Sequence, residues 1–218
     1  TNHVVGLPGK SGDPSPVTAF GTYMGMKACA KIRYGSDSLE GKKILVQGAG
    51  HVGEYLVAHL RKEGAHVLIS DINENTVKRV SNTYGAIGVS LDSVYDQEMD
   101  IYAPCALGGT INDETLSKLK CGIVAGAANN QLGIEDIHGL ALLNKGILYA
   151  PDFAINAGGV MNCFSEVKGL SNDWALVKSE KIYNTIHDIV SRSEKERTPS
   201  HIIAMKMAEE KINKGSKK

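Results

Sequence analysis

The chain has 218 residues, of which 42% are apolar and 22% charged, so it can bury a sizeable core and is not an intrinsically disordered segment. Lysine plus arginine and aspartate plus glutamate number 24 each. This balance provides no overall basic field for nucleic acid and argues against an anionic membrane as partner. No apolar run reaches the roughly 18 residues that a membrane-spanning helix needs.

The cysteines and glycines narrow the class further. Four cysteines lie far apart without a C-x-x-C pair, namely Cys29, Cys105, Cys121 and Cys163. This spacing predicts neither a zinc site nor a disulfide framework, so we expect free thiols, no bound metal and a cytoplasmic location. The 24 glycines exceed the usual share of about 7%, and such a composition is typical of an α/β domain whose loops approach a ligand.

Short apolar runs alternate with helical patterns along the first 150 residues. The helical patterns cover residues 15–35, 52–64, 73–84, 112–119 and 134–144, and the apolar runs predict strands at 42–47, 66–70, 87–91, 99–103, 121–125 and 147–149. Ser15 is expected to be the N-cap of the first helix and Gly35 its stop. Because the strands are continuous apolar runs separated by helices, we expect a parallel sheet covered on both faces.

The pattern changes after Pro151. The last part of the chain contains no further strand, and helices are expected at 160–168, 174–192 and 200–213. We therefore divide the chain into an α/β domain at residues 1–150 and a C-terminal helical segment at residues 151–218. The α/β domain begins with a loop rich in glycine and proline at residues 6–14, which is interpreted as a hinge to a further domain that this chain lacks.

A glycine-rich turn follows the strand at 42–47 and opens the next helix. Its pattern is Gly48-x-Gly50-x-x-Gly53. The first glycine allows the tight turn, the second the approach of a pyrophosphate, and the third close packing of helix on strand. The helix N-terminus would add free N–H groups for the anion. The alternatives are a plain strand–helix turn and the site of a methyl-donor nucleotide.

An acidic residue completes this pattern. Asp71 follows the second strand, 18 residues after Gly53, where a carboxylate can accept hydrogen bonds from ribose hydroxyls. A carboxylate there also repels a 2′-phosphate, so NAD is favoured over NADP. The alternative role of Asp71 is N-cap of the following helix. With turn, strand and acid in register, we predict a Rossmann-type doubly wound parallel sheet and assign residues 1–150 as its dinucleotide-binding domain.

Three later loops would lie at the same edge of the sheet, beyond the carboxyl ends of the strands. Residues 104–109 are small and apolar and suit an adenine or a ribose. Residues 127–131 place three amides together, and Asn129 and Asn130 could hold a nicotinamide carboxamide or simply form a turn and helix cap. Residues 156–162 contain paired glycines, and Asn156 could bind a carboxylate.

These loops together resemble the leucine, phenylalanine and valine dehydrogenases of the glutamate dehydrogenase superfamily. The resemblance runs nearly from end to end and is carried by the stretches GDPSPVTA at 12–19, QGAGHVG at 47–53, SDIN at 70–73, APCALGG at 103–109, NNQL at 129–132 and YAPDFAINAGG at 149–159. It implies reversible oxidative deamination of a hydrophobic L-amino acid to a 2-oxo acid and ammonia, with NAD as hydride acceptor.

The resemblance also implies roles for particular residues. Thr18 and one of Asn129 and Asn130 would hold the nicotinamide, and Asn156 would contact the substrate carboxylate. Val160 and Cys163 would line the pocket for the substrate side chain, the alternative being that both pack in the core. The full set of expected cofactor contacts is Thr18, Gly48, Gly50, His51, Val52, Gly53, Asp71, Ile72, Cys105, Ala106, Leu107, Asn129 and Asn130.

Two positions depart from the family, and one part of it is missing. His51 stands where the family often has asparagine, and Cys163 where it has a small aliphatic residue. The family's catalytic lysines and aspartate lie on an N-terminal substrate domain, so no catalytic residue is assigned in this chain. We expect an amino acid or 2-oxo acid as ligand and a homo-oligomer for the full protein. The alternative is a stand-alone NAD-binding module without catalysis.

Overall fold

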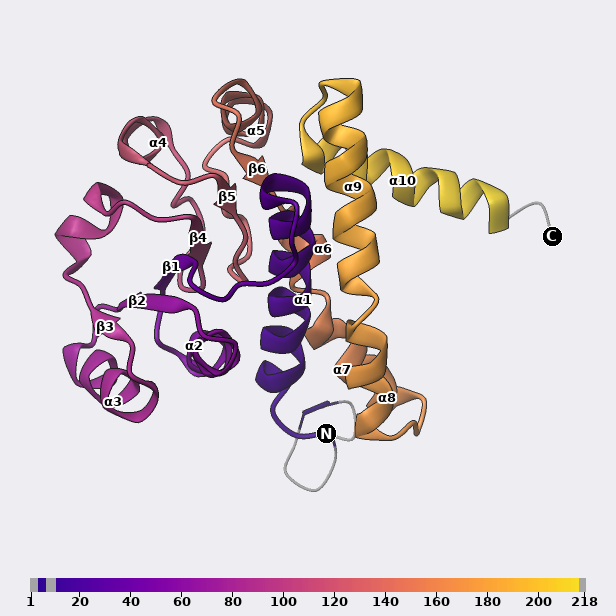
Figure 1. Cartoon of the computed structure of the whole chain (residues 1–218). Helices are drawn as coiled ribbons and strands as arrows, with labels where there is room; N and C mark the ends of the chain where they lie inside the picture. The colour runs from indigo at the N-terminus through magenta and orange to yellow at the C-terminus, as the bar shows by residue number, and fades with distance from the viewer. Residues whose placement is uncertain (1–3, 7–10, 216–218) are drawn as a thin grey trace.

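The structure is a computed structural model that describes residues 4–6 and 11–215 (Figure 1). Residues 7–10 of the expected hinge loop lie outside the described residues. In the described part, an α/β half with a central sheet adjoins a set of C-terminal helices, and the long helix α1 (Ser15–Tyr34) runs between them. In this part of the chain, no helix has both the length and the apolar character that crossing a bilayer requires.

The sheet has six parallel strands in the order β3-β2-β1-β4-β5-β6. They are β1 (Lys43–Gln47), β2 (His66–Ser70), β3 (Ile87–Gly88), β4 (Ile101–Pro104), β5 (Ile123–Val124) and β6 (Leu148–Tyr149). The order reverses between β1 and β4, and in such a sheet the loops at the carboxyl ends of the strands form a ligand-binding crevice there. The prediction of a Rossmann-type doubly wound sheet is confirmed.

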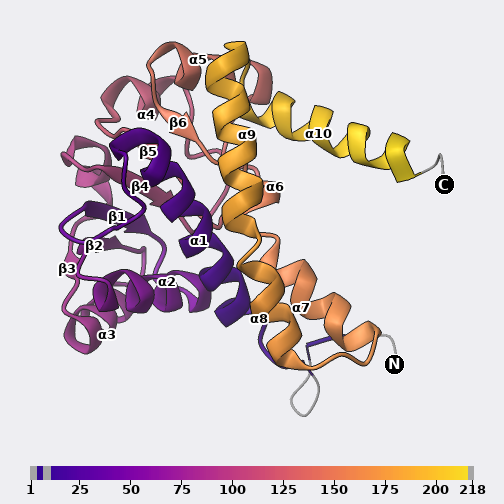
Figure 2. The same ribbon diagram turned by 45° about the vertical axis from the view of Figure 1, so that its right-hand side comes forward.

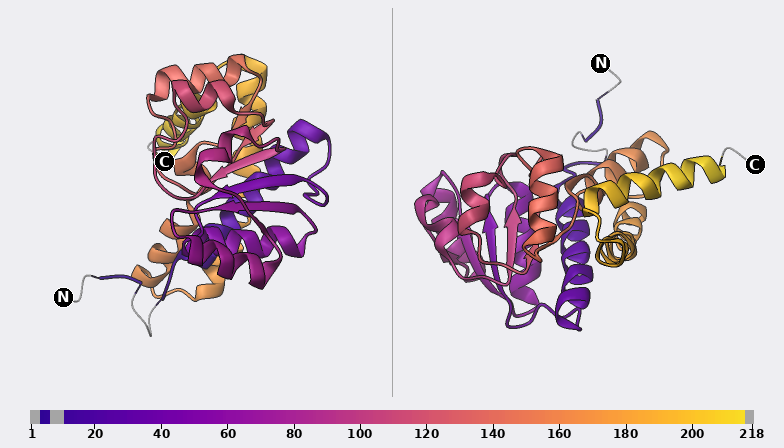
Figure 3. Two further views of the ribbon diagram at one scale, coloured as in Figure 1. Left: turned by 90° about the vertical axis from the view of Figure 1, so that its left-hand side faces the viewer. Right: turned by 90° about the horizontal axis from the view of Figure 1, so that it is seen from above.

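Helices cover both faces of the sheet, as Figure 3 shows from the side and from above, and the strands send alternate side chains into two separate cores. Ile44 and Val46 pack in one core with α1, α2 (His51–Lys62) and α3 (Glu74–Tyr84). Leu45 points to the other face, into a core formed with η1 (Leu91–Asp96), α4 (Asp113–Lys118) and α5 (Glu135–Asn144). Because both faces are covered, the strands read as uninterrupted apolar runs.

The C-terminal helices are packed on the first core through α1. They are α6 (Asp152–Ile155), α7 (Gly158–Val167), α8 (Asn172–Ser179), α9 (Ile182–Glu196) and α10 (Ser200–Gly215). Helices α1 and α9 lie side by side in Figures 1 and 2. Ile182 and Ile186 of α9 are fully buried against α1. Most of α10 projects away from the body. The apolar core is therefore continuous from the sheet into the C-terminal helices.

The C-terminal part differs from the expected helices in two places. Residues 174–192, expected as one helix, belong to two, because α8 ends at Ser179 and α9 begins at Ile182. Helix α8 packs on α7, where the rings of Phe164 and Trp174 lie 5.6 Å apart, whereas α9 packs on α1. The short helix α6 was not expected.

Smaller differences concern the α/β half. The expected third strand at 87–91 pairs only at Ile87–Gly88 and is followed by the 3₁₀ helix η1. Pro14, and not Ser15, is the N-cap of α1, and the Ser15 N–H is bonded by the Asp13 carboxylate at 2.9 Å. The end of α1 is as expected, with Gly35 in the left-handed conformation and its N–H donating to Lys31.

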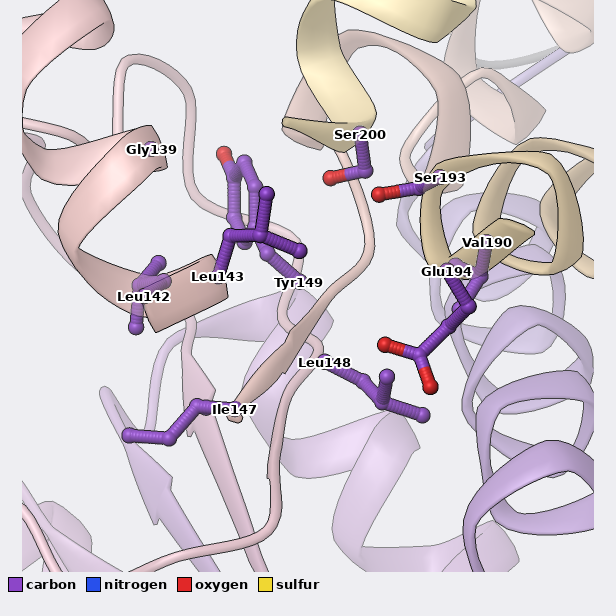
Figure 4. A pocket seen from close by; sticks show the side chains of 10 residues that line it. All are labelled: Gly139, Leu142, Leu143, Ile147, Leu148, Tyr149, Val190, Ser193, Glu194 and Ser200. Carbon is purple, nitrogen blue, oxygen red and sulfur yellow. The ribbon is translucent and has the colours of Figure 1, made fainter. Parts of the chain in front are cut away.

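A pocket lies where the sheet meets the C-terminal helices, and Figure 4 shows it from close by. Its lining comes from α5, β6, α9 and the start of α10, with the Ser193 and Ser200 hydroxyls on one side and Tyr149 and Leu143 on the other. None of the residues expected to bind cofactor or substrate lines it. The pocket therefore lies between the α/β half and the C-terminal helices and is separate from the expected cofactor and substrate site.

Candidate functional site

The glycine turn between β1 and α2 is closely packed at two of its three glycines. Gly48 has a φ of +114°, and a Cβ there would stand 2.7 Å from the Cys105 backbone carbon. A Cβ on Gly53 would overlap the carbonyl of Gly48. A Cβ on Gly50 would meet no atom within 4 Å, and Gly50 is exposed. Protein packing therefore demands Gly48 and Gly53, while the space in front of Gly50 is open.

The first turn of α2 borders this open space. Its N-cap, Gly50, supplies no side chain to the free N–H groups of the turn. In contrast, α3 and α4 are capped by the asparagine side chains of Asn73 and Asn112, each accepting two backbone N–H bonds. An uncapped helix N-terminus with room before it favours an anion such as a phosphate group.

Asp71 at the end of β2 is held by the turn itself. Its Oδ2 accepts the Ala49 N–H at 2.7 Å and its Oδ1 accepts the Asn73 N–H at 2.8 Å. The N-cap of α3 is Asn73, so the alternative role of Asp71 as that cap is not what the structure has. A carboxylate fixed in this way, and still partly exposed, can accept hydrogen bonds from a ligand at the glycine turn.

A surface hollow adjoins Asp71 at the ends of β2 and β3. It is lined by Asp71, Ile72, Glu74, Val77, Lys78, Gly88, Val89, Ser90, Leu91 and Asp92. Ile72 is 88% exposed, as expected for an apolar side chain that a bound group would cover. The hollow lies beside the glycine turn, because Asp71 lines it and is bonded to Ala49 of that turn.

His51 is the first residue of α2 and points to the loop before α1. Its Nδ1 lies 3.1 Å from Oδ2 of Asp13. Burial acts to raise the pKa of Asp13, but hydrogen bonds from Ser15 and His51 outweigh it and lower the pKa. The pair joins the leading loop to the glycine turn, a contact that the sequence pattern did not indicate.

The loop after β4 covers the space between the turn and the amide loop. Cys105 is packed against Gly53, and burial raises the pKa of its thiol to about 11, so the thiol is neutral at physiological pH. Ala106 and Leu107 are exposed, Leu107 to 80%. Gly109 donates its N–H to the Asn130 carbonyl at 2.7 Å, which joins this loop to the amide loop.

The expected amide loop faces the loop after β6. Asn156 donates from Nδ2 to Oδ1 of Asn129 at 2.6 Å and to the Ala127 carbonyl at 3.2 Å. Asn130 has a φ of +52°, a left-handed turn conformation that asparagine tolerates. Neither Asn129 nor Asn130 caps α5, whose N-cap is Ile134. Asn129 is exposed, so its amide is available to a ligand.

Thr18 lies in the first turn of α1, next to the paired glycines of α7. A Cβ on Gly159 would stand 2.9 Å from Oγ1 of Thr18, and one on Gly158 would overlap the Val17 carbonyl. The Thr18 hydroxyl donates to the Pro14 carbonyl at 2.9 Å. The structure thus places Thr18 against the start of α7, two to three residues after Asn156, and Asn156 in turn is bonded to Asn129.

Val160 and Cys163 lie on α7, directly after the paired glycines. Val160 is 74% exposed, which does not fit the alternative that it packs in the core. Cys163 is partly buried. The exposed Val160 side chain is available to an apolar group of a ligand or of another domain, and its assignment to a substrate pocket stays a prediction.

Two carboxylates near these loops were missed by the sequence analysis. Asp152 at the start of α6 is only 7% exposed and accepts the Gln131 N–H at 3.2 Å. Glu166 of α7 accepts the N–H groups of Gly6 and Ser11 and the Ser11 hydroxyl, which ties the leading loop to α7. A proline–acid pair at a strand end was the available signal for Asp152, while Glu166 had none.

Among residues 4–6 and 11–215, no three histidine, cysteine, aspartate or glutamate side chains gather as metal ligands would. The fold and the turn define the class of protein. The chain is a Rossmann-like α/β domain with a glycine-rich turn after the first strand and an acid at the end of the second strand.

Comparisons with known proteins assign the chain to a family within this class. The sequence profile described as Glutamate/Leucine/Phenylalanine/Valine dehydrogenase matches residues 69–214. The chain is 49% identical over 217 residues to a leucine dehydrogenase of Bacillus subtilis and 39% identical over 213 residues to an L-tryptophan dehydrogenase of Nostoc punctiforme, with 98% of this chain covered in each. The chain belongs to the glutamate/leucine/phenylalanine/valine dehydrogenase family, as the resemblance predicted.

Solved structures agree with this assignment. A crystal structure of L-tryptophan dehydrogenase from Nostoc punctiforme superimposes with a TM-score of 0.92 at 38% identity and covers 95% of this chain. A hetero-hexameric glutamate dehydrogenase from Thermus thermophilus shares the fold, with a TM-score of 0.72 at 21% identity. The chain spans 59% of the length of the Bacillus subtilis relative and 63% of the Nostoc punctiforme structure.

Proposed function

We propose that this chain is the NAD-binding part of an L-amino-acid dehydrogenase, which interconverts a hydrophobic L-amino acid and its 2-oxo acid plus ammonia. The observation that carries the proposal is the open space at Gly50, bordered by an uncapped helix N-terminus and by the fixed carboxylate of Asp71. The leucine, tryptophan and valine dehydrogenases among its relatives support the reaction class.

The residues present fit a dinucleotide along the edge of the sheet. The pyrophosphate would meet Gly50 and the first N–H groups of α2, bordered by His51 and Val52. Asp71 would accept the ribose hydroxyls, with Ile72 and the hollow beside it covering the adenine. Ala106 and Leu107 would lie along the middle, and Thr18 with Asn129 or Asn130 would hold the carboxamide. NAD, when bound, supplies the hydride acceptor.

The chain's own contribution to the reaction is binding and orientation. Asn129 and Asn130 offer amides to the carboxamide, which limits rotation of the nicotinamide ring. Asn156 would donate to the substrate carboxylate, and Val160 with Cys163 would bound the space for its side chain. The buried Cys29 and Cys105 thiols are held neutral, with pKa values raised to about 12 and about 11, and are unsuited to act as nucleophiles.

The proposal assigns proton transfer to a separate substrate domain. The match covers 59% of the Bacillus subtilis relative, which leaves room for such a domain in the remaining part of that relative. The full protein is proposed to be a homo-oligomer in the cytoplasm. The four free cysteines of the chain support the reducing compartment. This chain alone should bind NADH but should not oxidise leucine, valine, phenylalanine or tryptophan.

Calorimetric titration of this chain with nucleotides tests the proposal. NADH should bind, NADPH should bind at least tenfold more weakly because of Asp71, and S-adenosylmethionine should give no heat. Equal affinity for NADH and NADPH, or binding of the sulfonium nucleotide, would contradict the cofactor assignment. If this chain oxidised amino acids, and if its specific activity rose as contaminating proteins were removed, the assignment of catalysis to a separate domain would be wrong.

A further inference from the structure

A buried carboxylate links the two loops that carry the proposed nicotinamide-binding and substrate-binding amides. Asp152 follows β6 and begins α6, and it is 7% exposed. Its Oδ2 accepts the N–H of Gln131 in the loop after β5 at 3.2 Å, and its Oδ1 accepts the N–H of Phe153 at 2.8 Å. Neither bond reaches a ligand, and Asp152 is not needed to close the glycine turn.

Gln131 completes this link from the other loop. It is fully buried, and its side-chain Nε2 donates to the carbonyls of Gly126 at 2.8 Å and Ala128 at 2.9 Å. The amide of Gln131 therefore closes the turn that contains Asn129, while its backbone N–H is bonded to Asp152. The side chain of Gln131 thus closes the turn from within, and the bond between its backbone N–H and Asp152 joins the turn to α6.

The carboxylate is unusual because no basic side chain is paired with it in the part of the chain that the structure describes. Burying a polar side chain costs free energy unless its hydrogen bonds are satisfied, and the side-chain partners of Asp152 are the N–H groups of Gln131 and Phe153. A well-packed apolar side chain at this position would avoid that cost. The polar side chain is therefore better explained by a need for orientation than by stability.

Helix α6 connects Asp152, its first residue, to Asn156, its C-cap. The helix is four residues long, and the Asn156 N–H donates to the Asp152 carbonyl at 3.0 Å across its single turn. One end of the turn is thus bonded to Gln131 in the buried interior, and the other end places the Asn156 amide 2.6 Å from Asn129 at the surface. The two bridges join the same two loops.

We propose that Asp152 is a positioning residue that holds Asn129 and Asn156 at the spacing required by the nicotinamide end of the cofactor. The proposal rests on the proposed function, because it assigns the amides to that end. Without the buried carboxylate, the loop after β5 and α6 would still be connected by the chain, but the exposed amide pair would lose its common anchor.

Comparison of two ligands tests this role. ADP-ribose carries the adenosine, pyrophosphate and ribose of NADH but no nicotinamide, so it contacts the glycine turn and not the amides. In the unchanged chain, NADH should bind more tightly than ADP-ribose by calorimetry. In Asp152→Asn, the affinity for NADH should fall about tenfold, while that for ADP-ribose should change less than twofold.

Two further variants separate positioning from general stability. Glu63→Gln removes another poorly exposed carboxylate that accepts a backbone N–H, that of Leu39, far from the amide loops, and it should lower thermal stability without changing the NADH to ADP-ribose ratio. If Asp152→Asn does not fold, Asp152→Glu tests the same link, since the added methylene moves the carboxylate oxygens away from the N–H groups of Gln131 and Phe153.

Each outcome has one meaning. A parallel loss of affinity for both ligands in Asp152→Asn, or an unchanged ratio in every variant of the link that folds, would overturn the positioning role. Equal affinities in the unchanged chain would show that the amides do not touch the nicotinamide, which also overturns it. If the unchanged chain bound neither ligand, the proposed function itself would be wrong, and this result is distinct from the others.

Discussion

The two ends of the candidate site are built in different ways. Beside β1 and β2, the backbone makes the site: Gly48 and Gly53 are in contact with neighbouring main chain, and Asp71 is bonded to two N–H groups. Beside β5 and β6, side chains make it, through the bridges Asn156–Asn129 and Asp152–Gln131. At the first end, close main-chain packing leaves no room for side chains at Gly48 and Gly53, whereas hydrogen bonds link the loops of the second end.

This difference predicts different consequences of substitution. Where close packing requires a glycine, an added side chain lowers the stability of the fold, whatever it does to ligand binding. Where amide orientation is required, a change can alter ligand affinity while the sheet remains folded. Gly50 is the exception at the first end, because the space that it leaves is open.

The largest expected effect contrasts two glycines of the same turn. Gly53→Val should lower the free energy of unfolding by about 4 kcal/mol or more, because its Cβ overlaps the Gly48 carbonyl. Gly50→Val, the matched control, should stay within about 1 kcal/mol but lose measurable NADH binding. Urea unfolding and calorimetry measure the two effects. A stable Gly53→Val, or an unaltered affinity in Gly50→Val, would contradict this account of the turn.

The next effect concerns cofactor choice at the same end. Asp71→Ala removes the carboxylate that would accept the ribose hydroxyls and repel a 2′-phosphate, so the preference for NADH over NADPH should fall about tenfold. It also leaves the N–H groups of Ala49 and Asn73 without their partner, which should cost about 1–3 kcal/mol of stability. Titration with both nucleotides, alongside thermal unfolding, checks this, and a preserved preference would place the ribose elsewhere.

Glu63 lies far from both ends of the candidate site, and its contacts make a pH-dependent contribution to the stability of the fold with which the other variants can be compared. Burial acts to raise the pKa of Glu63, but hydrogen bonds from Lys27, Tyr23 and the Leu39 N–H lower it overall. A lowered folded-state pKa stabilises the protein above the ordinary value of about 4.5, and this stabilisation is lost as the pH falls further. Glu63→Gln should cost about 2 kcal/mol at pH 7 and less at pH 3. An equal cost at both pH values would exclude this linkage.

The smallest effect tests the substrate end in the full-length enzyme. Val160→Ala removes part of an exposed apolar wall, so kcat/KM should shift about fivefold, or ~1 kcal/mol, from small aliphatic toward bulkier amino acids. Val167→Ala on the same helix is the matched control, since Val167 is 69% exposed and lies about two turns further on. A uniform loss on all substrates would show that Val160 has a structural role.

The fold could be predicted well where the cause was local. The strands were recognisable because both faces of the sheet are covered, and the end of α1 because Gly35 adopts a positive φ. The break between α8 and α9 could not be predicted, since no proline or glycine separates Ser179 from Ile182. It arises because α8 packs on α7 and α9 on α1, which is a tertiary cause.

The sequence by itself determined the alternating sheet, the glycine turn and the acid after β2, because strand burial and the absence of Cβ atoms leave a direct trace in residue type. Only the tertiary structure decided that Asn156 meets Asn129, that Thr18 lies against Gly159, and that a buried Asp152 holds Gln131. These contacts depend on how separate loops pack and where their side chains point, and polar residues in loops are compatible with many such arrangements.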